Sequence, residues 1–113
     1  MNSDYFPWLV LGAVIAALMI FKRLGQISPV KARELVKSGA KLIDVRSPAE
    51  FASGHIEGAV NVPVGALKDD KLGAKDQPLI VYCASGTRSA MARSVLKSRG
   101  YTQVFNLGAM SRW

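Results

Sequence analysis

The wholly apolar run LIVY at residues 79–82 follows Pro78 and leads directly into Cys83, the only cysteine of the 113-residue chain. A run of this kind is typical of a strand buried in a parallel sheet. The segments on either side of it alternate between helix and strand signals, which is the pattern of a parallel sheet covered by helices on both faces. The sequence therefore predicts an α/β fold with residues 79–82 as a buried strand.

The helices are marked by their capping residues. Ser28-Pro29 has the pattern of an N-cap followed by proline at the first helical position, and Gly39 marks the end of that helix. The segment SPAE at residues 47–50 has the pattern of a capping box, and Gly54 ends the short helix that it opens. We also expect a helix at Arg88–Arg99, strands at residues 41–45, 59–62, 79–82 and 104–105, and a loop with a helical turn at residues 65–77.

An uncharged apolar segment, Tyr5–Phe21, precedes this α/β region, and the first of the 15 basic residues is Lys22. A helix of this length spans about 25 Å, near the short end of what a bilayer core of about 30 Å requires. Proline at position 7 suits the first turn of such a helix. We therefore predict a tail at residues 1–4, a retained single-pass transmembrane helix in the lipid bilayer at residues 5–21, a linker at residues 22–26 and one folded domain at residues 27–113.

A cleaved signal peptide and a buried core helix are the alternatives for the apolar segment. The N-terminus MNSDYFP lacks the positive charge of a signal peptide, and the run shows no polar face of the kind that a helix at a domain surface needs. Basic residues follow the span at Lys22, Arg23, Lys31 and Arg33. By the positive-inside rule, we expect the C-terminal domain in the cytoplasm, and a short anchor of this kind fits a bacterial inner membrane.

Composition excludes several functional classes. One cysteine and one histidine cannot build a disulfide framework or a structural metal centre, and no glycine-rich nucleotide-binding motif is present, so we expect neither metal nor cofactor. Residues 22–113 carry all 15 basic residues and 7 of the 8 acidic residues, a net charge of +8. Without a dense basic run, this charge indicates a solvated face near an anionic membrane rather than a nucleic-acid partner.

Cys83 lies between the buried strand and the helix expected from Arg88. In parallel α/β sheets, ligands bind where loops leave the carboxyl ends of the strands. Backbone N–H groups of such a loop, together with the dipole of the following helix, favour an anion and lower the pKa of a thiol. Cys83 is therefore the candidate nucleophile, with Arg88 as an adjacent cation. The alternative is an inert buried thiol.

Three segments carry a resemblance to a known family. The loop CASGTRS, residues 83–89, resembles the Cys-x-x-Gly-x-Arg-Ser active-site loop of single-domain rhodaneses, which are sulfurtransferases. Residues 44–63, DVRSPAEFASGHIEGAVNVP, are similar to the Asp-x-Arg, Glu-Phe, Gly-His-Ile and Gly-Ala-x-Asn-x-Pro features of that family. The ending NLGAMSRW resembles its closing Gly-x-x-x-Trp segment, with Ala109 at the position where a second glycine is common in that family. The resemblance covers residues 27–113.

The resemblance implies a rhodanese-like fold and a sulfurtransferase mechanism. The thiolate of Cys83 would take the outer sulfur of thiosulfate, or of a similar small anionic donor, as a persulfide and pass it to a thiol or cyanide-like acceptor. With one cysteine in the chain, the acceptor must come from outside, and it can be a protein. The residues expected to bind the donor and the persulfide are Ala84, Ser85, Gly86, Thr87, Arg88 and Ser89. Among them, Arg88 would hold either the charge of the donor or the shape of the loop.

Two other functions remain open at this point. A Cys-based phosphatase or arsenate reductase would carry Cys-x5-Arg, whereas this chain has Cys-x4-Arg, and the carboxylates on offer as general acids are Asp69 and Asp70. A membrane-tethered persulfide carrier or regulatory module is compatible with the same loop. We expect His55 to be structural, and Asp44 and Arg46 to form a buried ion pair or loop tether.

Overall fold

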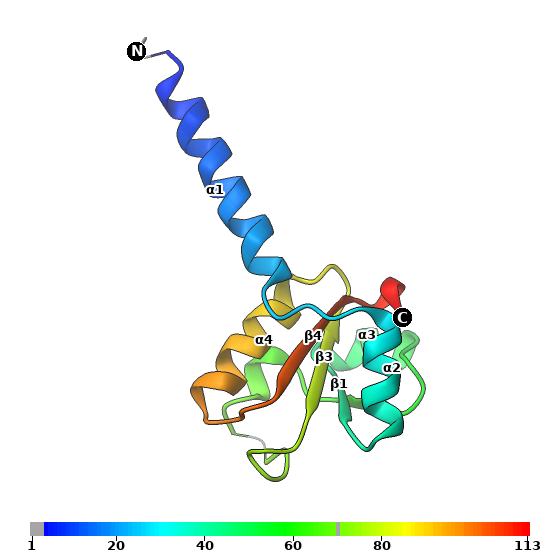
Figure 1. The fold of residues 1–113 in the computed structure, drawn as a ribbon. Coiled ribbons are helices and arrows are strands. Elements are labelled where there is room, and N and C mark those ends of the chain that lie inside the picture. The colour runs from blue at the N-terminus through cyan, green and yellow to red at the C-terminus, as the bar shows by residue number, and fades with distance from the viewer. Residues whose placement is uncertain (1–3, 70) are drawn as a thin grey trace.

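The computed structural model describes residues 4–69 and 71–113; Met1–Ser3 of the predicted tail and Asp70 lie outside the described residues. A long helix, α1 (Phe6–Arg23), projects from an α/β domain (Figure 1). The domain contains the remaining elements in the order α2 (Pro29–Lys37), β1 (Lys41–Asp44), α3 (Pro48–Ser53), β2 (Val60–Asn61), η1 (Val64–Ala66), β3 (Leu79–Cys83), α4 (Thr87–Ser98), β4 (Val104–Ala109) and η2 (Met110–Arg112).

The strands form one parallel four-stranded sheet in the order β2-β1-β3-β4. All five residues of β3 are buried, as the apolar run predicts. Because the strands are parallel, β1, β3 and β4 end at the same edge of the sheet, and Cys83 closes β3 at that edge. The predicted fold class is confirmed.

Helices cover both faces of the sheet (Figure 1). On one face, α4 packs its buried residues Ala92 and Leu96 into a cluster that includes Val81 and Cys83 of β3. On the other face, Ala32 of α2 joins a cluster with residues of β1, β3 and β4. These two apolar layers hold β3 and its terminal cysteine between them.

The local capping signals are confirmed. Ser28 caps α2, since its Oγ accepts a hydrogen bond from the Lys31 N–H at 3.1 Å. At α3, the N–H of Glu50 donates to Ser47 Oγ and the N–H of Ser47 donates to Glu50 Oε1, each at 3.2 Å, which completes the capping box. Glu50 is thereby held in a fixed place at the start of α3.

The structure corrects the bounds of several expected elements. The strand expected at residues 59–62 is limited to Val60–Asn61, and after Pro63 the chain turns into the 3-10 helix η1. The strand expected at residues 104–105 continues to Ala109, with a register shift between Val81 and Tyr82 on the neighbouring β3. Helix α4 begins at Thr87, one residue earlier than predicted.

The segment expected to be a linker, residues 22–26, is instead part helix and part sheet edge. Helix α1 continues through Lys22 and Arg23. The chain then runs beside β4, where the N–H of Asn106 donates to the Gly25 carbonyl and the N–H of Ile27 donates to the Asn106 carbonyl, both at 3.0 Å. These bonds extend β4 beyond its expected end, and they attach α1 to the domain without a free spacer.

Gly25 is required at this junction. Its φ of +68° lies in the left-handed region, and a Cβ there would collide with the side chain of Arg93 on α4. Arg93 in turn donates from Nε to the Val104 carbonyl at 3.0 Å, so its side chain cannot easily move away. The crossing of α1, α4 and β4 is therefore closely packed.

Helix α1 itself has no buried residue. This exposure rules out the core-helix alternative. By its length and composition the helix could cross a membrane, since its mean hydropathy over Phe6–Arg23 is 1.7. Signal sequences near an N-terminus meet the same criteria of length and composition.

Candidate active site

The loop after β3 folds around the sulfur of Cys83. Gly86 turns the chain with a φ of +100°, and its N–H donates to Cys83 Sγ at 2.9 Å. The next residue, Thr87, begins α4, so the sulfur lies at the N-terminal end of a 12-residue helix. The geometry matches the expected anion-binding turn between a strand and a helix.

The local hydrogen bonds favour the thiolate. Burial of the sulfur alone would raise the pKa of Cys83, but hydrogen bonds from the Ser89 hydroxyl and from the backbone N–H groups of Ser89, Gly86 and Ser85 outweigh it. The net pKa of the thiol is lowered from its ordinary value of 9.0. The sequence-based expectation of a depressed thiol pKa is therefore consistent with the geometry of the loop.

The Ser89 hydroxyl can form a hydrogen bond with Cys83 whether the cysteine is a thiol or a thiolate. Its Oγ lies 3.5 Å from Cys83 Sγ and donates to the Gly86 carbonyl at 3.1 Å. When Cys83 is a thiol, the S–H can point at Ser89 Oγ. When Cys83 is a thiolate, the Ser89 hydroxyl can turn its proton to the sulfur, and the Gly86 carbonyl keeps its helical bond from the Ala90 N–H at 3.1 Å.

We expect the substitution Ser89→Ala to raise the pKa of Cys83, because it removes a hydrogen bond that stabilises the thiolate. The ultraviolet absorbance of the thiolate, followed as a function of pH, measures this change. Ser98→Ala is the matched control, since it removes a hydroxyl at the far end of the same helix, where Ser98 bonds to the Val95 carbonyl. A Ser89→Ala titration curve that overlays the control would contradict the assignment.

The predicted loop residues take up different positions. Gly86 and Ser89 are buried against the sulfur, whereas Ala84, Ser85 and Thr87 are exposed along the outer side of the loop. Cys83 itself is fully buried, with no exposed surface. A substrate therefore reaches the sulfur only after the loop side chains or the cysteine rotamer shift.

Arg88 is held by a carboxylate rather than pointing freely at the sulfur. Its guanidinium makes a two-bond ion pair with Glu50 of α3, with N–O distances of 2.6 and 3.0 Å. The Arg88 hydrogen bond, followed by the Ser47 N–H, lowers the pKa of Glu50 to about 2. Of the two roles expected for Arg88, holding the donor or holding the loop, the pairing favours the second.

The sequence analysis recognised Glu50 as part of a capping box and of the Glu-Phe feature, but not as the partner of Arg88. One carboxylate oxygen caps α3 and also accepts from Arg88, so the start of α3 and the start of α4 are tied together. The sequence signal for this second role is weak, because 38 residues separate the partners.

The other residues considered for the site have structural contacts. Asp44 and Arg46 form the expected buried ion pair, with an N–O distance of 2.7 Å, and Arg46 also donates to the Gly54 carbonyl at 2.7 Å. His55 is exposed, stacks on Phe51 with 3.7 Å between ring centroids, and bonds to the Phe51 carbonyl. Asp69 is exposed.

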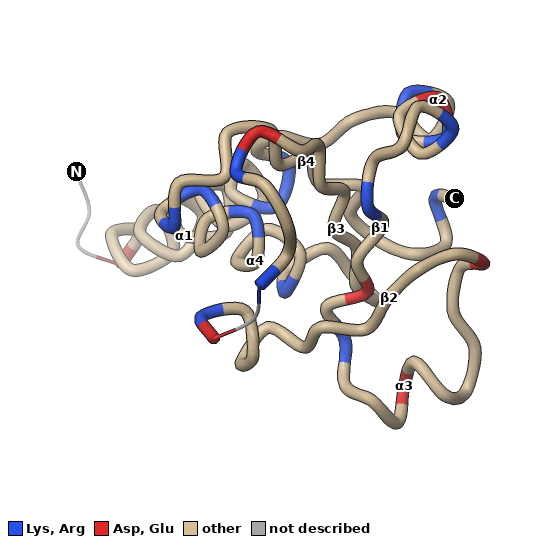
Figure 2. Tube along the Cα trace, turned by 90° about the horizontal axis from the view of Figure 1, so that it is seen from below, with Lys and Arg blue, Asp and Glu red and all other residues tan. Residues whose placement is uncertain are grey.

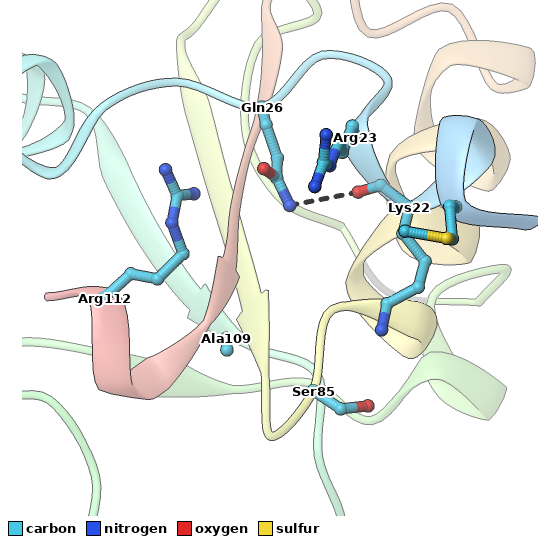
Figure 3. Close-up of a pocket in the computed structure, with 7 residues that line it drawn as sticks. Lys22, Arg23, Gln26, Ser85, Ala109 and Arg112 are labelled. Atoms are coloured by element: carbon cyan, nitrogen blue, oxygen red, sulfur yellow. Dashed lines mark hydrogen bonds between the residues drawn. The ribbon is translucent and has the colours of Figure 1, made fainter.

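A cavity of about 200 Å³ opens beside the cysteine loop (Figure 3). It lies between the end of α1, the end of β4, η2 and Ser85 of the loop. Figure 3 shows the Lys22 side chain extending toward Ser85, with Arg112 on the opposite side. The cavity is lined by Met19, Lys22, Arg23, Gln26, Ser85, Ala109 and Arg112.

Ser85 is the one predicted site residue in this lining. The sequence analysis assigned Lys22 and Arg23 to the membrane interface and gave Arg112 no role. Figure 2 shows basic residues at the inner end of α1 and along α4, close to this part of the domain. The convergence of α1 with η2 depends on the docking of residues 25–27 on β4, for which the sequence has no local signal.

Comparison with known proteins places this site in a family. A family described as Rhodanese-like domain matches residues 28–113. The chain belongs to the rhodanese-like family. A thiosulfate sulfurtransferase, GlpE, of Ectopseudomonas mendocina is 40% identical over 95 residues, which are 82% of this chain and 84% of the relative. The Bacillus subtilis protein YqhL is 43% identical over 76 residues, 66% of this chain and 60% of the relative.

Solved structures agree with this assignment. The human single-domain sulfurtransferase TSTD1 has a TM-score of 0.68 and is 30% identical, covering 79% of this chain and 91% of that one. An Escherichia coli rhodanese solved with anions has a TM-score of 0.64 and is 32% identical, covering 66% of this chain and 92% of that one. The enzyme class is therefore that of a rhodanese-type sulfurtransferase.

Proposed function

We propose that this rhodanese moves a sulfane sulfur from thiosulfate, or from a similar anionic donor, to a thiol or cyanide-like acceptor through a persulfide on Cys83. The observation that supports the proposal most directly is the ring of donors around Cys83 Sγ, in which Gly86 N–H lies at 2.9 Å and Ser89 Oγ at 3.5 Å. The names of the GlpE relatives point to thiosulfate as the class of donor.

The reaction balances in two half-steps. The Cys83 thiolate attacks the outer sulfur of thiosulfate, the S–S bond of the donor breaks, and sulfite leaves with the electron pair. The anionic persulfide that remains is stabilised by the loop N–H groups and the N-terminal end of α4. An acceptor thiolate or cyanide then attacks the outer persulfide sulfur and releases the Cys83 thiolate.

The size of the loop supports sulfur rather than phosphate as the transferred group. Four residues separate Cys83 from Arg88, one fewer than in the Cys-x5-Arg loops of phosphatases and arsenate reductases. In addition, the Gly86 N–H lies at hydrogen-bond distance from the sulfur, so the loop is folded closely around Cys83. The exposed Asp69 has no described contact with the loop that would make it a general acid.

The experiment that tests this proposal is the intact mass of the full-length chain in detergent micelles, first after thiosulfate and then after cyanide. We expect a gain of one sulfur atom after thiosulfate and its loss after cyanide. No gain of mass would contradict a thiosulfate-derived persulfide.

We further propose that α1 is a retained single-pass anchor and that the domain lies on the cytoplasmic side. The support is the exposure of the apolar helix, none of whose residues is buried, and the position of Lys22 and Arg23 in its last turn. Such an anchor would also suit a carrier that passes its persulfide to a protein at the membrane. Retention of the full-length chain in membranes after an alkaline carbonate wash supports the anchor, and release of the chain contradicts it.

A further inference from the structure

The cavity beside the cysteine loop combines a position near the reactive sulfur with an excess of positive charge. We propose that this cavity, which we call the basic pocket and define by Lys22, Arg23, Gln26, Ser85 and Arg112, binds the sulfonate end of the anionic sulfur donor. The last turn of α1 would then be part of the substrate site, although it lies outside the rhodanese-like domain. The inference rests on the proposed function and adds the residues that select the donor.

The position of Lys22 is the first argument. Its Cε lies 3.5 Å from the point where a Cβ on Gly86 would project, so the Lys22 side chain lies against the turn that holds Cys83 Sγ. In Figure 3 the Lys22 side chain extends toward Ser85, which follows Cys83 by two residues. A donor held here has its sulfane sulfur beside the loop that the nucleophile occupies.

The charge of the pocket is the second argument. The described lining carries three cations, Lys22, Arg23 and Arg112, and includes no carboxylate. Arg88, the cation of the cysteine loop itself, is already paired with Glu50 through two hydrogen bonds. A dianion such as thiosulfate therefore finds its compensating charge in the basic pocket rather than at Arg88.

The rigidity of the pocket is the third argument. The Lys22 carbonyl accepts from Gln26 Nε2 at 3.1 Å and from Asn106 Nδ2 at 3.3 Å, and Asn106 is fully buried. On the other wall, Arg112 donates to the Leu107 carbonyl. These bonds fix the backbone at Lys22 and the guanidinium of Arg112 before a ligand arrives, so less ordering is needed when the donor binds.

Gly108 keeps the pocket open. Its φ of +88° lies in the left-handed region, and a Cβ there would lie 2.7 Å from Gln26 Nε2 and 3.4 Å from an Arg112 nitrogen. A side chain at this position would therefore push apart two of the residues that define the pocket.

Steady-state kinetics of the full-length chain in neutral detergent tests the proposal. We expect Lys22→Gln and Arg112→Gln each to raise the KM for thiosulfate about tenfold with little change in kcat, because each removes one charged hydrogen-bond donor to the substrate. Lys22→Arg should keep the KM near that of the wild type. Lys31→Gln, which removes an exposed lysine from α2, is the matched control and should leave the KM unchanged.

A second donor separates charge recognition from general damage to the loop. Methanethiosulfonate has the same sulfane sulfur as thiosulfate but carries one negative charge, because a methyl group replaces one oxygen. We expect the KM for this monoanion to rise less than the KM for thiosulfate in Lys22→Gln. An equal rise for both donors would overturn the proposal.

Different results would contradict donor binding in the basic pocket and persulfide formation on Cys83. If the wild type forms a persulfide but Lys22→Gln and Arg112→Gln leave the KM for thiosulfate unchanged, the basic pocket is not the donor site. The same result is expected if the pocket holds a lipid phosphate instead. If the wild type forms no persulfide with thiosulfate, the proposed function itself fails.

Discussion

Replacing Cys83 by serine is expected to reduce sulfur transfer from thiosulfate to cyanide to the uncatalysed rate and to abolish the gain of one sulfur atom in the intact mass. A serine hydroxyl remains protonated at neutral pH and is a far weaker nucleophile than a thiolate. The fold should persist, because serine differs from cysteine by one atom and can still accept the hydrogen bond from the Gly86 N–H. The measurement is steady-state turnover together with intact mass.

The interpretation of this variant depends on two comparisons. Thermal unfolding of Cys83→Ser should overlay that of the wild type within a few degrees, which separates loss of the nucleophile from loss of the fold. Retained turnover would mean that the sulfur passes through a different group, and the persulfide mechanism would be abandoned. In that case the donor ring around Cys83 would have only a structural role.

The largest expected effect on stability comes from Asp44→Ala. Asp44 and Arg46 are both buried, and Asp44 accepts from Arg46 at 2.7 to 3.1 Å, including the Arg46 N–H at 2.9 Å. Removal of the carboxylate leaves a buried guanidinium without its counter-charge, which costs about 3–5 kcal/mol in comparable cases. Because a small domain has only about 5–15 kcal/mol of stability, denaturant unfolding should show a large fall in the midpoint.

The same pair predicts how stability depends on pH. Burial would raise the pKa of Asp44, but hydrogen bonds from Arg46 outweigh it and hold the pKa below its ordinary value of 3.8. A carboxyl whose pKa is lower in the folded state stabilises the fold above its unfolded pKa and loses that contribution as the pH falls through the folded pKa. We therefore expect the wild type, unlike Asp44→Ala, to lose stability from this source only below about pH 4.

Two controls make the stability prediction specific. Glu57→Ala removes an exposed carboxylate and should change the free energy of unfolding by about 0.5 kcal/mol or less. The double variant Asp44→Ala with Arg46→Ala removes both charges, and it should be less destabilised than the sum of the two single variants. A single Asp44→Ala variant as stable as Glu57→Ala would show that the pair contributes little.

Much of the fold could be predicted because its signals are local. The apolar run at residues 79–82 indicates a buried strand in any context, and the Ser47–Glu50 spacing defines a capping box within four residues. Cys83 could be proposed as the nucleophile from the sequence for the same reason, since strand, cysteine, glycine and helix follow one another directly along the chain. The family resemblance then supplied the activity that these local patterns alone could not specify.

The rest of the site could not be predicted, because it depends on contacts between distant segments. The Glu50–Arg88 pair spans 38 residues, and the bond from Asn106 to the Lys22 carbonyl spans 84. Lys22 follows an apolar segment, and membrane anchoring alone explains a lysine at such a position. The sequence therefore did not indicate that Lys22 also lies beside the cysteine loop. Charge and spacing in the sequence indicate which residues could contribute to a site, but not which of them lie close together in the fold.

If α1 lies in a bilayer, as proposed, the docking of residues 25–27 on β4 has a further consequence. Since the end of α1 and the cysteine loop lie at the same edge of the sheet, and no free spacer separates them, the domain cannot swing away from the lipid surface (Figure 1). The reactive sulfur is then held at a fixed height above the headgroups. A partner protein anchored in the same membrane would then encounter it by a two-dimensional search.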